Sequence, residues 1–425
     1  MTRPTEEVER LLRTEAPQVL GALVRRFGRF DIAEDAVQEA LLAAIRTWPA
    51  DGVPENPRAW LIRIGYRKMV DLLRADQARR RREREAGLAD LAMGEPARHA
   101  GPPPDTDDSL TLLLLCCHPA LSPASQVALT LRAVGGLTTA EIAHAHGTTE
   151  NTMGTRISRA KQQLARAGAR FTPPTDADRD SRLAAVAQVL YLIFNEGYTT
   201  SSGDALTRVD LTHEAIRLTR MLHAGLPADD EVAAEVTGLL ALMLLTEARQ
   251  PARTGDDGEL VPLEEQDRTR WRPDLIREGT GLIDGVWLRR RLGPYQVQAA
   301  IAAVHATASS PERTDWPQIA ALYLWLERLA PTAPVRLSRV VAVARAYGPE
   351  RGLALLDDLN RSHHLDRNPL THQRERAVRA HLLQMTGDTT GAAAFYRQAA
   401  TLTGNHVEQR YLHDKADHLD PPDRR

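Results

Sequence analysis

The stretch LTTAEIAHAHGTTENTMGTRISRAKQQL, residues 137–164, predicts two short helices joined by a tight turn. Thr138 and Glu141 form a capping box, the arrangement that marks the start of a helix. Gly147 is expected to end this helix, because glycine tolerates the left-handed conformation found just after helix C-termini. Thr149 is then expected to cap a second helix. The residues of this stretch therefore predict a helical hairpin.

The second helix of this hairpin has two contrasting faces. Its apolar residues are spaced four, three and four apart, which predicts one buried stripe: Met153, Ile157, Ala160 and Leu164. Hydroxyl, amide and cationic side chains occupy the helix start and the other face: Thr149, Asn151, Thr152, Thr155, Arg156, Arg159 and Lys161. Such side chains can contact base edges and phosphates in a DNA major groove. We predict a DNA-binding helix-turn-helix, with a plain solvated helical hairpin as the alternative.

A second informative stretch, residues 31–84, predicts two further helices. Asp31 and Glu34 predict the first helix start by the same capping pattern. Four residues form the expected inner stripe of this helix: Val37, Leu41, Ala44 and Trp48. The residues left facing away combine acidic and apolar side chains, as a protein-binding surface does: Asp35, Gln38, Glu39, Leu42 and Ile45.

The next expected helix begins near Pro57 and runs into a cluster of cations. Residues 61–84 carry nine basic and three acidic side chains. Aromatic and basic residues alternate here in a way that suits single-stranded DNA, whose bases stack and whose phosphates need neutralising: Arg63, Tyr66, Arg67, Lys68 and Arg74. Trp60 is expected in the core, whereas the position of Tyr66 is left open. A basic run that is only a solvated helix face is the alternative.

These three segments together resemble the extracytoplasmic-function (ECF) sigma factors, the small members of the sigma-70 family. DIAEDAVQEALLAAI (residues 31–45) is similar to the polymerase-binding helix of sigma region 2. NPRAWLIRIGYRKMVDLLR (residues 56–74) is similar to the segment that binds the -10 promoter element. LTTAEIAHAHGTTENTMGTRISRAK (residues 137–161) is similar to region 4, which binds the -35 element. The segments occur in the family's order, and the resemblance spans roughly residues 6–170.

The resemblance implies a role for each group of candidate residues. Polymerase binding is expected from Asp31, Glu34, Asp35, Gln38, Glu39, Leu42 and Ile45. Contact with the -10 element is expected from Arg63, Tyr66, Arg67, Lys68 and Arg74, and contact with the -35 element from Thr149, Asn151, Thr152, Thr155, Arg156, Arg159 and Lys161. Departures from the family pattern at His146, Thr148 and Gly154 leave the exact -35 sequence open. Gly154 also lowers the helix propensity at its position by about 1 kcal/mol.

Composition restricts the other possible functions. The 425 residues carry a net charge of -2, but residues 1–172 hold 24 Lys and Arg against 21 Asp and Glu. Cys116 and Cys117 are the whole cysteine content and are adjacent on an expected helix, so we expect core packing and no metal or disulfide. Nucleotide-binding, hydrolase and metalloprotease motifs are absent, so no enzyme and no cofactor are predicted. A charged N-terminal segment and apolar runs of at most eight residues predict a cytoplasmic protein without a membrane span.

Two composition breaks predict three domains in an all-α chain. We expect region 2 over residues 1–84, a linker over 85–108, region 4 over 109–171, a second linker over 172–180 and a helical extension over 181–425. Paired amphipathic helices in the extension, with a Gly-Asp turn and an Asn-His turn near its end, resemble tetratricopeptide-like repeats, and the whole resembles the ECF subgroup with such an extension. One face of an expected helix is Leu211, Ala215, Leu218 and Leu222, and four small residues are expected where helices approach closely: Ala392, Ala393, Ala394 and Ala399. Three residues of its FNEGY segment are expected to make a loop or interdomain contact: Asn195, Glu196 and Tyr198. A catalytic role for Glu196 is the weaker alternative.

The combined prediction is a sigma factor that directs core RNA polymerase to promoter DNA. The extension is expected to regulate or dock in cis, through an intramolecular contact with the sigma regions. The alternative is a stand-alone helix-turn-helix regulator with a repeat-type sensor domain. A regulator of that kind would bind its duplex unaided and would direct no synthesis by the polymerase.

Overall fold

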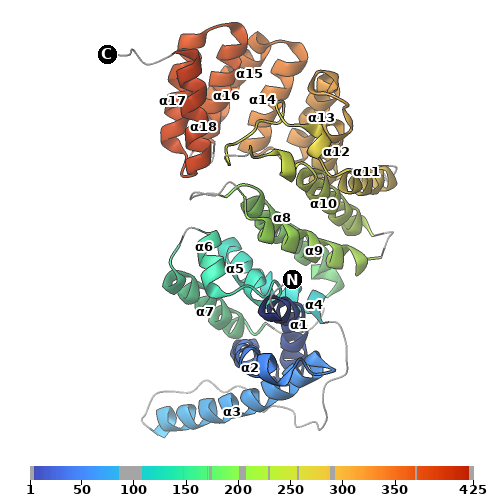
Figure 1. Ribbon diagram of the computed structural model, residues 1–425, viewed down its shortest axis with the longest axis vertical. Helices are drawn as coiled ribbons and strands as arrows, with labels where there is room; N and C mark the ends of the chain where they lie inside the picture. The colour runs from blue at the N-terminus through green and yellow to red at the C-terminus, as the bar shows by residue number, and fades with distance from the viewer. Residues whose placement is uncertain are drawn as a thin grey trace. The chain divides into compact units, whose positions relative to one another are not determined.

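The computed structural model describes residues 4–85, 108–146, 148–169, 171, 175–200, 207–227, 230–255, 258–287, 292–368 and 371–420. Over these residues the chain is helical and contains no strand, apart from one isolated antiparallel bridge between Thr254 and Leu260 (Figure 1). The all-α prediction is therefore confirmed. Two expectations, Gly147 as a helix end and residues 86–107 as a linker, lie outside the described residues. None of the helices described is long and apolar enough to cross a membrane.

The chain forms two compact units, Met1–Leu192 and Ile193–Arg425. The first unit contains α1 (Pro4–Phe27), α2 (Phe30–Asp51), α3 (Pro57–Glu85), α4 (Ser109–Cys116), α5 (Pro123–Ala133), α6 (Thr139–Ala145) and α7 (Glu150–Arg166). Helices α1, α2 and α3 pack on one another, and α5, α6 and α7 form a second group that reaches α2 through α7. Cys116 and Cys117 are fully buried in the core of this unit, and no metal-binding cluster is found among the described residues.

The start of α2 differs from the prediction. The helix begins at Phe30, one residue before the expected cap, and the residue at the cap position is Arg29, which makes no side-chain cap bond. The carboxylate of Asp31 accepts two hydrogen bonds from the Arg29 guanidinium, at 3.0 and 2.8 Å, and does not cap the helix. Asp31 as a capping residue was therefore wrong, because a neighbouring cation captures its side chain. The inner stripe was right for Val37, Ala44 and Trp48, whereas Leu41 is only half-buried.

Helix α8 (Asp176–Tyr198) runs across the boundary between the two units. Residues 176–192 belong to the first unit, where Arg182 donates a hydrogen bond to the backbone carbonyl of Leu114. The last residues of α8 belong to the second unit. Residues 176–180 are helical, so the second half of the expected linker 172–180 is part of α8; residues 172–174 lie outside the described residues. Helix α8 therefore begins within the expected linker.

The second unit is an array of helices in which successive helices pack on each other. It contains α9 (Val209–Ala224), α10 (Glu231–Glu247), α11 (Pro273–Trp287), α12 (Pro294–Thr307), α13 (Trp316–Leu329), α14 (Ala333–Tyr347), α15 (Pro349–His363), α16 (His372–Thr386), α17 (Thr389–Leu402) and α18 (His406–Leu419). Three short 3-10 turns lie between them: η1 (Gln250–Ala252), η2 (Arg268–Arg270) and η3 (Pro311–Arg313). Separate apolar clusters join α12 to α14, α14 to α16 and α16 to α18.

Local patterns in the extension were predicted well. The expected stripe of α9 is fully buried: Leu211, Ala215, Leu218 and Leu222. Gly387 ends α16 with a positive φ of 89°, and Asp388 caps α17 through the backbone N–H of Gly391. Asn405 caps α18. Of the four alanines expected where helices approach closely, Ala394 is exposed, and that expectation was wrong for it because it lies on the outer side of α17.

Candidate nucleic-acid and polymerase interface

The helix-turn-helix segment is built by the local hydrogen bonds that its sequence predicts. The Thr138 hydroxyl accepts a hydrogen bond from the Glu141 backbone N–H at 3.1 Å, and the Glu141 carboxylate accepts one from the Thr138 N–H at 2.7 Å. This reciprocal capping box starts α6. Thr149 caps α7 by accepting from the backbone N–H of Thr152 at 3.2 Å. The two caps set where each helix begins and so which side chains share a face.

The two faces of α7 separate as expected. Met153, Ile157, Ala160 and Leu164 are all buried against the rest of the first unit. Asn151, Thr152, Thr155 and Arg159 are exposed, and Arg156 is half-exposed. A surface groove is lined by side chains of this exposed face together with one residue of α6: Thr139, Glu150, Asn151, Gly154, Thr155, Ser158, Arg159 and Gln162. The groove offers hydroxyl, amide and guanidinium groups, which are the donors and acceptors that DNA recognition uses.

Lys161 has a different environment from the other cations of α7. Its side chain is 12% exposed, and its Nζ lies 2.9 Å from Glu34 Oε2 and 2.9 Å from Asp35 Oδ1 of α2. Arg132 of α5 donates to the other oxygen of Glu34 at 2.8 Å. Glu34 itself is 4% exposed. Glu34 was expected to bind polymerase, and in this structure its carboxylate is enclosed between two cations.

The protonation behaviour of this cluster follows from its partners. Burial opposes ionisation of Glu34, but Lys161 and Arg132 outweigh burial and hold the pKa of the carboxyl below its ordinary value of 4.5. Burial likewise opposes the charge of Lys161, yet Glu34 and Asp35 raise the pKa of its ammonium group. Glu34 and Lys161 are therefore both charged at neutral pH. Sequence reasoning missed Arg132, although it is the single charged residue of the otherwise uncharged helix α5.

The outward face of α2 combines apolar and acidic side chains. Leu42 and Ile45 are each 45% exposed, and their spacing of three residues places them on one face of the helix. Asp35 and Glu39 are exposed on the same helix, and Gln38 is half-exposed. Glu39 also forms a 3.3 Å ion pair with Lys68 of α3, between two side chains that are about half exposed. A solvent-exposed pair of this kind contributes at most about 1 kcal/mol and is readily replaced by other partners.

The basic face of α3 lies opposite a buried stripe of that helix. Leu61 and Met69 are fully buried. Arg63, Arg67 and Arg74 are exposed, and Tyr66 is 37% exposed with its ring centroid 5.3 Å from that of Phe27. Trp60 packs edge to face on the buried Trp48, with ring centroids 5.4 Å apart. Trp60 was expected in the core, but it is only half-buried beside Trp48, and Tyr66 exposes its ring on the same helix.

The FNEGY segment at the end of α8 is held from inside the second unit. Phe194 is buried and stacks on Tyr198, and the guanidinium of Arg253 lies 3.5 Å above the Tyr198 ring. Arg253 also donates to the Tyr198 carbonyl and to the Thr199 hydroxyl. A Cβ on Gly197 would lie 2.7 Å from the backbone nitrogen of Thr212, so α8 and α9 cross too closely for any other residue. Sequence reasoning missed Arg253, which is 55 residues away from Tyr198.

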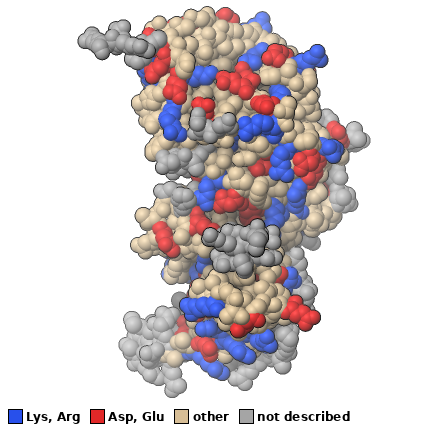
Figure 2. Space-filling model, in the orientation of Figure 1, with Lys and Arg blue, Asp and Glu red and all other residues tan. Residues whose placement is uncertain are grey.

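Charge is spread over the molecule without large patches of one sign on the face drawn in Figure 2. Acidic and basic side chains alternate there over both units. The extension, residues 173–425, carries 30 Lys and Arg against 35 Asp and Glu, but this excess is not gathered on that face.

Comparisons with known families divide the chain in the same order as its motifs. Residues 11–80 match Sigma-70 region 2, and residues 111–164 match Sigma-70, region 4. Residues 182–286 match a family of unknown function, DUF6596. No solved structure matches the chain.

Several known proteins are similar to the chain. The uncharacterized protein R00370 of Rhizobium meliloti is 42% identical over 414 residues, which is 95% of this chain and 93% of that protein. The RNA polymerase sigma factor CnrH of Cupriavidus metallidurans is 30% identical over 181 residues, 37% of this chain and 93% of that protein. The ECF RNA polymerase sigma factor SigG of Mycobacterium tuberculosis is 30% identical over 183 residues, 38% of this chain and 47% of that protein.

The ordered regions 2 and 4, the capped helix-turn-helix and the similarity to almost the whole of a sigma factor agree with one another. This chain belongs to the ECF sigma factors of the sigma-70 family, which act in transcription initiation, and it carries a C-terminal extension that includes a DUF6596 segment.

Proposed function

We propose that this protein directs RNA polymerase to a specific set of promoters, and that its C-terminal extension regulates this step in cis. In the proposal, α2 binds the core enzyme, α3 holds the -10 element and α7 reads the -35 element. The observation that carries the proposal is the arrangement of α7, whose exposed side presents Asn151, Thr155 and Arg159 while the opposite side is buried. A helix that is packed on one side and polar on the other can enter a major groove without unfolding.

Two side chains of α2 support the assignment of a polymerase-binding surface. Leu42 and Ile45 expose apolar area beside Asp35 and Glu39, and apolar area with a charged rim is typical of protein interfaces. In α3, the exposed ring of Tyr66 lies between Arg63 and Arg67, which suits stacking of an unpaired base with neutralisation of its phosphates.

The ion pairs of Glu34 add a step to this proposal. Lys161 is occupied by Glu34 and Asp35 in this arrangement of the first unit, so it reaches DNA only after α7 separates from α2. Phosphate groups offer Lys161 an alternative anion of the same sign. We infer that promoter binding and separation of α7 from α2 are coupled, and that Asp35 is released at the same time for the polymerase.

Helix α8 supports a regulatory role of the extension in cis. It continues from the first unit, where Arg182 bonds to Leu114, into the FNEGY segment, where Tyr198 is held by Arg253. A helix transmits a change at one end to the other better than a flexible loop does. In this proposal, Glu196 makes a loop or interdomain contact and is not catalytic. The extension is proposed to consist of tetratricopeptide-like helical repeats.

Run-off transcription with purified core polymerase tests the assignment of α7. Arg159→Ala is expected to lower promoter-specific transcripts by about tenfold or more, as the loss of a base contact would. Arg166→Ala, at the exposed far end of the same helix, is the matched control and is expected to change them little. Equal losses in both variants, or binding of duplex without any transcription, would point instead to a stand-alone regulator.

The polymerase-binding surface is tested by pull-down with core enzyme. Replacing Leu42 and Ile45 with Ser removes the exposed apolar area of α2 without touching its buried stripe, and binding is expected to fall about tenfold. Val53→Ser is the control, since Val53 is equally exposed but lies in the turn after α2. Unchanged binding by the double variant contradicts this surface.

Interrupting α8 tests the role of the extension. Leu192 is exposed at the boundary between the units, so Leu192→Pro breaks the helix while Leu192→Ala keeps it. The proline variant is expected to change run-off yield, with a rise indicating inhibition by the extension and a fall indicating a required contact. If both variants transcribe like the unaltered protein, the extension is an independent module.

A further inference from the structure

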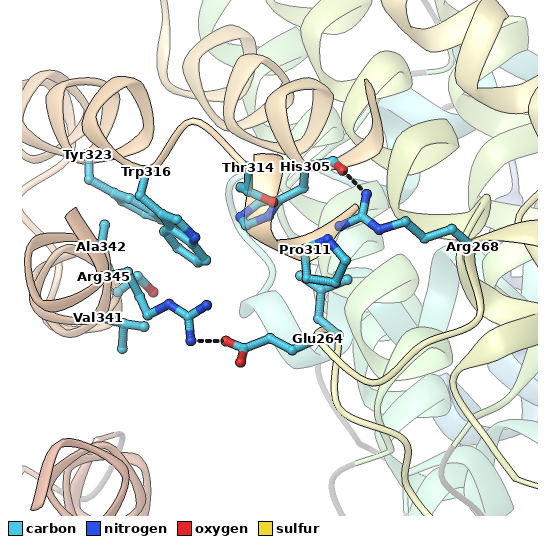
Figure 3. A pocket seen from close by; sticks show the side chains of 12 residues that line it. Glu264, Arg268, His305, Pro311, Thr314, Trp316, Tyr323, Val341, Ala342 and Arg345 are labelled. Atoms are coloured by element: carbon cyan, nitrogen blue, oxygen red, sulfur yellow. Dashed lines mark hydrogen bonds and ion pairs between the residues drawn. The ribbon is translucent and has the colours of Figure 1, made fainter. Parts of the chain in front are cut away.

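A pocket of about 300 Å³ lies in the second unit (Figure 3). Helices α12, α13 and α14 form one side of it, and the segment that carries Leu263, Glu264 and Arg268 forms the other. Its volume lies at the small end of the range of roughly 300–1,000 Å³ found for small-molecule sites. Nothing in the sigma function described above uses this pocket.

The lining combines apolar surface with cations. Leu263, Pro311, Trp316, Tyr323 and Val341 supply the apolar surface. Arg268 and Arg345 approach the pocket from different sides in Figure 3. The Arg345 guanidinium is 2.6 Å from the Glu264 carboxylate and lies 5.0 Å from the centre of the Trp316 ring. Arg268 donates to the carbonyls of His305 and Ala308, at 2.9 and 2.6 Å.

Two buried donors on these side chains lack an acceptor. The indole Nε1 of Trp316 and the Nε of Arg268 have no hydrogen-bond partner among the described residues. A buried N–H without an acceptor costs about 1–3 kcal/mol, so a molecule that brings an acceptor into the pocket gains that energy on binding. Trp316 also holds its ring edge to face with the His305 imidazole, at 5.2 Å between centroids, which fixes the direction of its N–H.

The local charge favours an anion. Burial, reinforced by Arg249, Arg268 and Arg345, lowers the pKa of His305 to about 4, so the imidazole is neutral at pH 7. Among the residues that line the pocket, two arginines, Arg268 and Arg345, face one glutamate, Glu264, which pairs with Arg345. One positive charge is therefore uncompensated among these groups.

We propose that this pocket binds a small organic carboxylate with a flat apolar body. The carboxylate accepts a hydrogen bond from Trp316 Nε1 and balances the extra positive charge beside Arg268, while the apolar body lies against Tyr323 and Val341. A single negative charge matches the pocket better than a doubly charged phosphate does. This site belongs to the extension alone and does not depend on the roles proposed for α2, α3 and α7.

Ligand-observed NMR on the full-length protein tests the proposal with benzoate, phenylacetate and indole-3-acetate as probes. Each probe is compared with its uncharged primary amide. At least one carboxylate is expected to bind saturably, and its amide at least about tenfold more weakly, because the charge-assisted hydrogen bond is lost. Trp316→Phe keeps the ring but removes the N–H, and it is expected to weaken binding about tenfold.

Arg268→Gln is expected to weaken binding of the carboxylate by a similar factor. Arg270→Gln is its matched control, because Arg270 is exposed in the same turn, η2. Arg268 also donates to the backbone carbonyls of His305 and Ala308, so Arg268→Gln could disturb the fold there. The conservative Trp316→Phe variant keeps the test valid in that case. The proposal is overturned if no carboxylate binds saturably, if carboxylates and amides bind equally, or if Trp316→Phe binds as tightly as the unaltered protein.

Discussion

A glutamate lies at a helix contact in each unit, and the two contacts hold it in opposite ways: Glu34 is buried and Glu235 is half-buried. In the first unit, Glu34 of α2 lies between Arg132 and Lys161. In the second unit, Glu235 of α10 accepts hydrogen bonds from the backbone N–H groups of Tyr295 and Gln296 at the start of α12, at 3.1 and 3.2 Å. Cations lower the pKa of Glu34, whereas burial raises the pKa of Glu235 despite its backbone donors.

The difference indicates which contact can be exchanged. Lys161 and Arg132 carry charges that could pair with another anion in place of Glu34, and the phosphates of DNA are such anions. The backbone N–H groups at the start of α12 donate to Glu235 of α10. Gly238 and Gly293 let α10 and α12 approach so closely that no side chain fits between them. We infer that the first unit is built to rearrange on binding, while the second unit is a fixed scaffold.

The largest expected effect comes from breaking the exchangeable contact. Glu34→Gln leaves two enclosed cations without their main counter-charge, so the first unit is expected to lose about 3 kcal/mol of unfolding free energy. Hydrogen exchange measured by mass spectrometry on α2 and α7 peptides of the full chain checks this. Glu39→Gln, which removes only the exposed pair with Lys68, is the control and should cost less than about 1 kcal/mol. Similar losses in the two variants contradict the special role of Glu34.

A second variant tests the fixed contact. A Cβ on Gly238 would lie 2.6 Å from the backbone nitrogen and 2.8 Å from the Cα of Gln296, and neither atom can move alone. Gly238→Ala is therefore expected to destabilise the second unit by about 2 kcal/mol, measured by denaturant unfolding. Gly281→Ala in α11 is the control, because nothing lies within 4 Å of its Cβ, and it should be neutral or stabilising. A tolerated Gly238→Ala would show that α10 and α12 are not closely fitted.

Acidity should affect the two contacts with opposite sign. Glu34 has a lowered pKa in the folded protein. Its stabilising contribution to the free energy of unfolding is therefore present above about pH 4.5 and is lost as the pH falls through the folded-state pKa. Glu235 has a raised pKa in the folded protein. Its stabilising contribution to the free energy of unfolding is therefore present below about pH 4.5 and is lost as the pH rises through the folded-state pKa. Hydrogen exchange of α7 and α12 peptides across this range should diverge. Glu34→Gln should remove the pH dependence of exchange in α7 only, and Glu235→Gln should remove it in α12 only. If both helices respond to either variant, the two contacts do not differ in the way proposed here.

The smallest expected effect is at Gly154 in α7. A Cβ there would meet only the Thr139 methyl group, at 3.8 Å, which is an ordinary contact. Gly154→Ala is therefore expected to stabilise the first unit by about 0.5–1 kcal/mol, seen as a higher melting temperature. A lower melting temperature would mean that α6 and α7 need the glycine for packing. A loss of promoter binding without a loss of stability would place a DNA backbone close to this position.

The caps and stripes of single helices were predictable from the sequence because they depend on residues three or four apart. Thr138 with Glu141, Thr149 with Thr152, and the stripe from Met153 to Leu164 are all local, so the helical period alone defines them. Asp31 shows the limit of this reasoning. It has the right spacing to Glu34 for a capping box, but Arg29 binds its carboxylate first and the helix starts a residue earlier.

The sequence by itself determined the all-α class, the order of the two sigma regions and the face of α7 that carries the candidate DNA contacts. Only the tertiary structure decided that Glu34 is enclosed, because Arg132 and Lys161 come from 98 and 127 residues away. The contact of Arg253 with Tyr198 and the pocket lined by Arg268 and Arg345 likewise bring together residues that are far apart in the sequence. Helix formation follows from short-range hydrogen bonds and periodicity, whereas the partner of a charged side chain depends on how the helices pack.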